Sequence, residues 1–225
     1  SHTGTSRVAA EVLKCDWNNC VIQRGDSRKH LPWNFGQFGS NTSFTMTRTN
    51  YVAAIDALEK LLEIAAIELG GSPADYDIGG ERVFRTEDPS VFITYADAAT
   101  RAIELGGKYS GENAPEDINA MTSRSVAGLA GTGLIGVARD NLEREGTVAA
   151  LAAGFIQIEL DLETGKYEIL DYLGVADCGT VLHPRGLEIQ IKSAAVMGFG
   201  MAGFERHAYD PQNGLPSATG IHNSK

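Results

Sequence analysis

The clearest pattern of apolar and polar positions runs from residue 50 to residue 71. Apolar side chains recur there at the three- to four-residue spacing of one helix face. Asn50 can cap the start of this helix, and the pair Gly70-Gly71 ends it. The pattern therefore predicts a long amphipathic helix with its apolar face formed by Val52, Ile55, Leu58, Leu62, Ala65 and Leu69.

Three shorter helices are predicted as well. One covers residues 5–14, where apolar residues gather on one side. A second covers residues 95–105 and is ended by Gly106. A third begins at Pro184, because proline suits the first turn of a helix and apolar residues follow it at helical spacing.

Strict alternation of apolar and polar residues predicts a β-hairpin near the end of the chain. Residues 155–161 form the first strand, the segment 163–165 (Glu-Thr-Gly) the turn, and residues 167–175 the returning strand. Two short strands are expected over 21–24 and 82–84. Because strands and helices do not alternate regularly, the sequence favours an α+β fold over a doubly wound sheet.

Two long stretches carry little periodicity. Residues 30–49 are rich in Gly, Ser, Thr and Asn and are predicted to form a long loop, which its aromatic residues keep ordered. The stretch from 108 to 150 is predicted to be a connector or irregular strands. We therefore expect two α+β lobes with mixed or antiparallel sheets packed by helices, at 1–88 and 151–225, joined by a connector at 89–150.

Composition narrows the function classes. The chain has 225 residues, 43% hydrophobic and 21% charged, as in a globular protein, and no apolar run of about 18 residues that would span a membrane. Its 19 basic and 29 acidic residues give a net charge of −10, which argues against nucleic acid as a partner. The chain reads as a piece of a longer protein, and the cytoplasm is favoured over the periplasm.

The reactive residues do not form a recognisable hydrolase or metal site. Three cysteines (Cys15, Cys20 and Cys178) and five histidines show no metal-binding spacing, and no G-x-S-x-G motif is present. The run from Asp161 to Gly165 resembles the opening of a calcium loop, but its glycine comes one position early, so a hairpin turn is the better interpretation.

Gly131, Gly133 and Gly136 match the G-x-G-x-x-G fingerprint of dinucleotide-binding folds. That fingerprint requires a preceding strand, a following helix and an acidic residue about 20 positions later. The segment before Gly131 is not rich in β-branched residues, and the acidic residues that follow come too soon. Chance is the better explanation in a chain with 26 glycines.

Hydroxyl side chains gather before two of the predicted helices. Helix N-termini offer unpaired N–H groups and a positive dipole end, so two such openings suit a phosphate-bearing cofactor. Plain N-capping in a polar loop explains the same residues, and the pattern alone favours that reading. The residues are Ser1, Thr3, Thr5 and Ser6 in the first group and Ser40, Thr42, Ser43, Thr45 and Thr47 in the second.

Two parts of the sequence resemble a known family. The first comprises the runs GTSRVAAEVL, GDSRKHLPW and FGSNTS, followed by the long helix, and the second is GFIQIELDLETGKYEILDYLGVADCGTVLHPRGLEIQIKSAAVMGFGMAGFE. Their order and spacing are similar to the C-terminal part of the molybdopterin-binding large subunit of the xanthine dehydrogenase/aldehyde oxidase family. The resemblance covers nearly the whole chain and is weakest over 90–150.

The resemblance implies a molybdenum hydroxylase, which oxidises an aldehyde or N-heteroaromatic substrate with water-derived oxygen. It implies molybdenum held by molybdopterin, often as a cytosine dinucleotide, with [2Fe–2S] clusters and FAD on other domains or subunits. The implied partners are the remaining part of the molybdenum subunit, iron–sulfur and FAD subunits, and a small-molecule substrate. A non-catalytic cofactor-binding or assembly module of the same fold is one alternative, and a nucleotide-binding domain built on Gly131 is a weaker one.

The resemblance also carries over residue roles. The first cofactor loop of the family matches the cluster around Thr3 and Gly4, and a glutamine that reaches the cofactor matches Gln190. The second cofactor loop matches Gly39, Ser40, Asn41, Thr42 and Ser43. The alternative interpretation is that Gln190 is a solvent-exposed helix residue without a role in binding. We expect the two loops and Gln190 to meet in the folded protein.

The sequence departs from the family pattern in ways that bear on catalysis. The family's catalytic glutamate stands in a late G-x-G-E motif, which has no match here, so no catalytic residue is assigned. Lys192 and Ser193 replace the glycines that usually follow the glutamine. An iron–sulfur cluster needs four ligands, and three cysteines are present. We therefore expect this chain to be inactive without partners.

Overall fold

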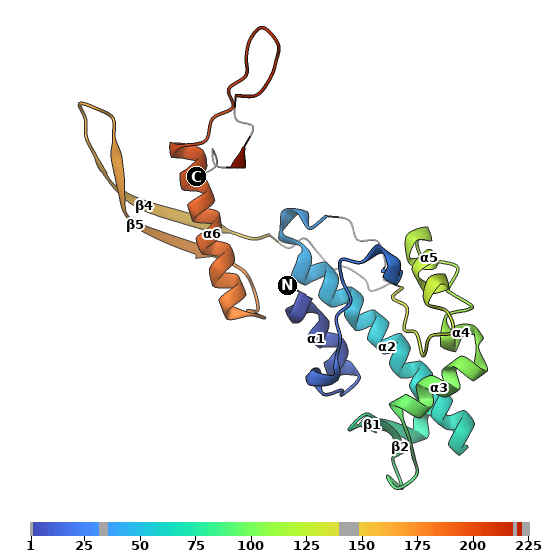
Figure 1. Cartoon of the computed structure of the whole chain (residues 1–225). Coiled ribbons are helices and arrows are strands. Elements are labelled where there is room, and N and C mark those ends of the chain that lie inside the picture. Colours follow the sequence, from blue (N-terminus) through green and yellow to red (C-terminus); the bar gives the residue numbers. More distant parts are fainter. Residues whose placement is uncertain (1, 32–35, 140–148, 218–219, 222–225) are drawn as a thin grey trace. The chain divides into compact units, whose positions relative to one another are not determined.

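The computed structural model describes residues 2–31, 36–139, 149–217 and 220–221 of the chain (Figure 1). Its contacts divide it into two compact units, Ser1–Glu143 and Arg144–Lys225, which are described one by one. The elements are helices with small antiparallel sheets, so the predicted α+β class is confirmed. The predicted lobe boundaries at residues 88 and 150 stay a prediction.

The first unit consists of helices around one small sheet. The antiparallel sheet has the order β1-β2-β3, with Ile78 opposite Val83 and Val83 opposite Ile93. The elements are α1 (His2–Val12), α2 (Thr42–Leu69), β1 (Tyr76–Gly79), β2 (Arg82–Arg85), β3 (Phe92–Thr94), α3 (Tyr95–Leu105), α4 (Gly107–Ser110) and α5 (Ala120–Leu129).

The core of this unit lies between the second half of α2, the sheet and α3. Ile64 and Val83 are completely buried there, together with two alanines of α3 that let the helix approach closely. The predicted apolar face of α2 is only partly correct, because its most buried residues are Leu61 and Ile64 next to Ala65. Three residues of the predicted face are partly buried against this core: Leu58, Leu62 and Leu69. The full cluster is Leu61, Ile64, Ala65, Tyr76, Ile78, Val83, Ala98 and Ala102.

Several local expectations are confirmed and others are wrong. Helix α3 has the predicted bounds, because the Thr94 hydroxyl accepts from the Asp97 N–H at one end and Gly106 closes the other. Helix α2 starts at Thr42 and not near Asn50, so the predicted loop over 30–49 ends earlier than expected. The segment 21–24 forms no strand, and α5 lies in the stretch expected to be a connector or irregular strands.

The stretch after α5 lies along α2 and is held there by an ion pair whose lysine is buried. Lys60 Nζ lies 2.6 Å from Asp56 Oδ2 and donates to the carbonyl of Ile135 at 2.8 Å. The same Asp56 oxygen accepts from the backbone N–H of Val137 at 2.7 Å. A Cβ at Gly136 would lie 2.3 Å from the carbonyl oxygen of Ala53, so only glycine permits this approach.

The second unit contains the predicted hairpin and helix. Strand β4 (Ala152–Leu160) pairs antiparallel with β5 (Tyr167–Ala176), and α6 (Pro184–Gly203) follows. At the hairpin turn, the Asp161 carboxylate accepts from the backbone N–H groups of Glu163 and Thr164 and from the Thr164 hydroxyl. This set of bonds identifies the run from Asp161 to Gly165 as a hairpin turn.

Little of the second unit is buried. In the described part of this unit, Gly200 on α6 is the one residue that reaches the buried class. Large apolar side chains such as Phe155, Leu173 and Met201 stay more than half exposed. The unit therefore lacks an enclosed core of its own.

Candidate cofactor-binding site

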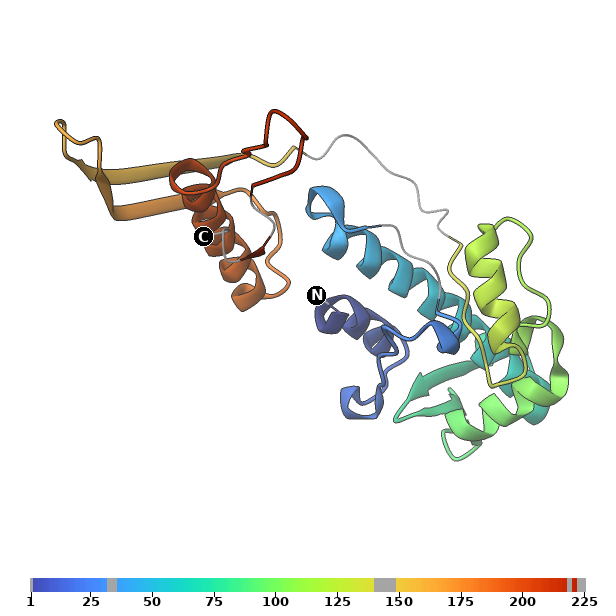
Figure 2. The ribbon, with the colours of Figure 1, turned by 45° about the horizontal axis from the view of Figure 1, so that its top comes forward.

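Helices α1 and α2 pack side by side and run in the same direction. Figures 1 and 2 both show their N-terminal ends at the same end of the pair. The two hydroxyl-rich segments of the sequence lie at these ends, although about 35 residues separate them along the chain. The fold thus brings the first and second predicted cofactor segments to one place.

The start of α2 lacks the usual side-chain cap. Gly39 and Ser40 have φ angles of 60° and 56°, so the backbone turns sharply just before the helix. Asn41 occupies the N-cap position without capping, and its Oδ1 is buried with no hydrogen-bond partner. Thr42 and Ser43 follow in the first turn, where backbone N–H groups have no intrahelical acceptor. This helix start can bind hydrogen-bonding groups of a ligand.

A shallow hollow of about 370 Å³ lies beside this helix start. Polar residues border it, but the surface that faces the hollow is almost wholly apolar. The Thr47 Oγ1 is a second buried polar atom without a partner. The lining residues are Val8 of α1 and Ser43, Phe44, Thr47, Arg48 and Tyr51 of α2.

Not all hydroxyl groups of the two clusters can serve a ligand. The Thr45 hydroxyl donates to the Asn41 carbonyl at 2.9 Å, four residues back in α2. The Thr5 hydroxyl donates to the His2 carbonyl at 3.3 Å, and Thr5 is buried. These bonds run back to carbonyls of the preceding helical turn and differ from the N-capping that the sequence alone favoured.

The remaining residues of the first segment lie in the opening turn of α1. Thr3 is exposed, and a Cβ built on Gly4 would meet no atom within 4 Å. The sequence placed both residues in a loop before the helix, but in the structure they lie within α1. Ser1 lies outside the described residues.

Gln190 lies on α6 and is exposed to solvent. It belongs to the second unit, and its predicted meeting with the starts of α1 and α2 stays a prediction.

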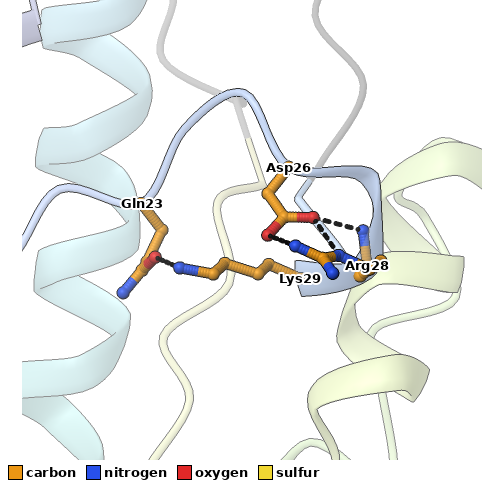
Figure 3. A network of polar contacts seen from close by, with 4 residues as sticks. All are labelled: Gln23, Asp26, Arg28 and Lys29. Carbon is orange, nitrogen blue, oxygen red and sulfur yellow. Dashed lines mark hydrogen bonds and ion pairs between the residues drawn. The ribbon is translucent and has the colours of Figure 1, made fainter.

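In the turn that follows Gly25, Arg28 is already paired with a carboxylate of the same turn. Figure 3 shows the Arg28 guanidinium against Asp26, with Nε and Nη2 at 3.0 and 3.1 Å from the two carboxylate oxygens. These hydrogen bonds from Arg28 lower the pKa of the Asp26 carboxyl. Lys29 donates to Gln23 Oε1 at 2.6 Å in the same view. The turn is therefore organised by its own side chains.

The structure provides no support for a nucleotide site at the glycine fingerprint. Helix α5 precedes Gly131, where the fingerprint requires a strand, and Gly136 serves the close packing against α2. Among the described residues, no group of three or more His, Cys, Asp or Glu side chains is arranged to hold a metal ion.

The sequence pattern named Thr47 in its second hydroxyl cluster, but it missed Arg48 and Tyr51 as residues beside this helix start. It placed residues 45–49 in a loop, because their polar character obscures the helical pattern. The signal that could have revealed them is the spacing of Phe44, Tyr51 and Ile55, which continues the apolar face of α2 by two turns.

Comparison with protein families identifies the family of this chain. Residues 1–225 match the model of the molybdopterin cofactor-binding domain along their whole length. The chain belongs to this family. The resemblance that the sequence suggested is confirmed.

The relatives of this molybdopterin cofactor-binding domain are subunits of oxidoreductases. It is 28% identical over 222 residues to the nicotine 6-hydroxylase large subunit of Paenarthrobacter nicotinovorans, covering 96% of this chain and 24% of that subunit. It is 25% identical over 215 residues to the molybdenum-binding subunit of an Escherichia coli (strain K12) aldehyde oxidoreductase, covering 95% and 24%. The chain thus spans about a quarter of the length of these relatives.

Solved structures share the fold. The model superposes on a Cu,Mo-CO dehydrogenase with a TM-score of 0.64 at 20% identity, covering 100% of this chain and 25% of that chain. Quinoline 2-oxidoreductase from Pseudomonas putida 86 gives a TM-score of 0.60 at 20% identity, covering 99% and 26%. In the part of the chain that the structure describes, no helix is long and apolar enough to cross a membrane.

The residues at the starts of α1 and α2 fit a molybdopterin. The unpaired acceptor on Asn41 suits the N–H groups of a pterin, and the uncapped N–H groups of α2 suit phosphate oxygens. The domain therefore offers both hydrogen-bond polarities that this cofactor requires.

Proposed function

We propose that this chain is the molybdopterin-binding part of a molybdenum hydroxylase that oxidises an aldehyde or N-heteroaromatic substrate. The observation that carries the proposal is the uncapped start of α2, with the buried, unpaired Oδ1 of Asn41 beside it. The relatives support the substrate class, since their names describe hydroxylation of nicotine and oxidation of aldehydes.

The residues of this chain would bind and orient the cofactor. Asn41 accepts hydrogen bonds from the pterin, while the first N–H groups of α2 and the Ser43 hydroxyl donate to phosphate oxygens. Thr3 and Gly4 complete the same end of the helix pair, with Gly4 leaving space for close approach. The resemblance to the family adds Gln190 of α6 as a further proposed cofactor contact.

When bound, molybdopterin carries the molybdenum that performs the oxidation with oxygen from water. The positioning of the cofactor is the work of this chain, and the catalytic base belongs to the remaining part of the molybdenum subunit. Iron–sulfur clusters and FAD on other domains or subunits would take up the electrons. The isolated chain is therefore expected to be catalytically silent, since a general base alone contributes about 10²–10⁴ in rate.

The proposal is tested by cofactor loading. The complex containing this chain is purified with wild-type sequence, with the double change Asn41→Ala/Ser43→Ala, and with Asn50→Ala. Asn50 is the matched control, because it lies two turns further along α2, where its side chain only donates to the Met46 carbonyl. Loss of two hydrogen bonds of about 1 kcal/mol each lowers cofactor affinity by roughly 30-fold.

Molybdenum and pterin per complex are the measurements, with turnover of an aldehyde and an N-heteroaromatic compound by a dye acceptor as the activity assay. The double variant should lose cofactor and activity together, while Asn50→Ala retains both. Equal loading of all three proteins would show that the start of α2 does not bind the cofactor. Loading without turnover of either substrate class would favour the non-catalytic module.

A further inference from the structure

The two faces of the β4–β5 hairpin differ in what covers them. The Tyr172 ring packs edge-to-face on Phe199 of α6, at 5.4 Å between ring centroids. A Cβ at Gly174 would lie 3.2 Å from Ile191 of α6. These contacts identify one face of the hairpin as the face that α6 covers.

The residues of the opposite face follow from the strand register. Phe155 is opposite Leu173, Gln157 is opposite Asp171, and Glu159 is opposite Glu168. An extra residue in β5, Leu170, shifts the alternation, so that Glu168 shares a face with Asp171. We call this the outer face: it comprises Ala153, Phe155, Gln157, Glu159, Glu168, Asp171, Leu173 and Val175.

The outer face combines two features that are unfavourable in water. Phe155 and Leu173 are a cross-strand pair, yet they are 63% and 59% exposed. Glu159 and Glu168 are directly opposite each other, and like charges in this position destabilise a hairpin. Among the described residues, no Lys or Arg forms an ion pair with these two carboxylates or with Asp171.

We infer that the outer face is a docking surface for the remaining part of the molybdenum subunit, which meets it with Lys or Arg side chains next to apolar ones. This inference rests on the proposed function. Relatives of this domain are about four times as long, so most of such a subunit lies outside this chain. A two-stranded hairpin is marginally stable alone, and covering its second face completes the unit.

The carboxylates of the outer face indicate that the partner surface is basic. A second copy of this chain would place its own paired carboxylates, and a net charge of −10, against the same features. A basic surface instead neutralises Glu159 and Glu168 while it covers Phe155 and Leu173. Like-charge pairs kept at a cost to the free chain are expected where a partner supplies the opposite charge.

The inference is tested on the complex purified through a tag on this chain. Carboxyl groups are labelled with glycine ethyl ester, in the complex and in the separated chain, and the label is quantified by peptide mass spectrometry. Glu159 and Glu168 should be labelled at least fivefold less in the complex, whereas Glu116 in the first unit serves as an exposed reference. A water-soluble carbodiimide should join the same glutamates to lysines of the remaining molybdenum subunit.

A charge reversal supplies a second, independent readout. Glu168→Lys places opposite charges across the strands, so it removes the like-charge repulsion within the hairpin itself. In the complex the same variant should weaken association at least tenfold, while Glu116→Lys, with the same change in net charge, leaves it unchanged.

The outcomes separate this inference from the proposed function. Equal labelling of Glu159 and Glu168 in both samples, or cross-links only to a second copy or to another subunit, overturns the docking surface. If that happens in a complex that carries molybdenum and pterin, the proposed function stands. A protected outer face in a complex without cofactor would contradict the proposed function and leave the docking surface intact.

Discussion

The two units of this molybdopterin cofactor-binding domain achieve order in different ways. In the first unit, α2 buries Ile64 and Ala65 completely against the sheet and α3. In the second unit, α6 touches one face of a hairpin whose side chains stay largely exposed. The first unit is expected to fold on its own contacts, and the second to depend on a surface that lies elsewhere. The predictions below test this contrast.

The largest effect is expected from the core of the first unit. Ile64→Ala removes a completely buried side chain and should lower the free energy of unfolding by about 2–5 kcal/mol. Ile189→Ala, the same change at a 62% exposed position of α6, should alter it by less than about 0.5 kcal/mol. Urea unfolding followed by circular dichroism measures both. Similar losses for the two variants would contradict the contrast.

The next effect concerns two ion pairs with the same helical spacing. Lys60→Met leaves the Asp56 carboxylate without its cation in a largely buried place and should cost about 2–3 kcal/mol. Lys192 pairs with Glu188 four residues before it on α6, but both side chains are exposed, so Lys192→Met should cost less than about 1 kcal/mol. Chemical denaturation of both variants measures the loss in unfolding free energy. An equal loss for the two variants would contradict the greater contribution of the Lys60–Asp56 pair.

Two glycines provide a smaller comparison. Gly136→Ala would force the 131–139 segment away from Ala53 and should destabilise by about 1–3 kcal/mol. At Gly198 of α6 an added Cβ meets no atom within 4 Å, so Gly198→Ala should favour the helix by about 1 kcal/mol. The midpoint temperature of thermal unfolding should fall for Gly136→Ala and rise for Gly198→Ala. A shift of the same sign in both variants would refute the packing argument at Gly136.

The smallest effect is a dependence on pH at the hairpin turn. Bonds from the Thr164 hydroxyl and from the N–H groups of Glu163 and Thr164 lower the pKa of Asp161. The turn is therefore stabilised above the ordinary carboxyl pKa, and this stabilisation is lost as the pH falls through the lowered value. Amide chemical shifts of residues 162–165 should follow that titration, and Asp161→Asn should abolish it.

The sequence predicted those elements whose ends carry local signals. Thr94 and Gly106 delimit α3, and the Glu-Thr-Gly turn sets the hairpin, so both were found with nearly correct bounds. The start of α2 was missed because the Thr-rich segment resembles a loop, whereas in the fold it continues a helix that packs against α1. The role of Gly136 depends on a contact across more than 80 residues, which periodicity does not reveal.

For the site, the sequence predicted the hydroxyl-rich segments, and the family resemblance supplied their purpose. It did not reveal which hydroxyls are already used: the bond from Thr45 to the Asn41 carbonyl depends on the helix continuing through this segment. The unpaired Oδ1 of Asn41 likewise becomes evident only in three dimensions, because an asparagine before a helix ordinarily caps it.

The central claim is that the start of α2 binds the cofactor. Hydrogen exchange, compared between the cofactor-loaded complex and the same complex after cofactor removal, tests it most directly. The account predicts that peptides covering residues 39–47 exchange faster without cofactor, while peptides covering residues 60–69 are unchanged. Unchanged exchange over residues 39–47, in a complex that had demonstrably lost its molybdenum and pterin, would contradict it.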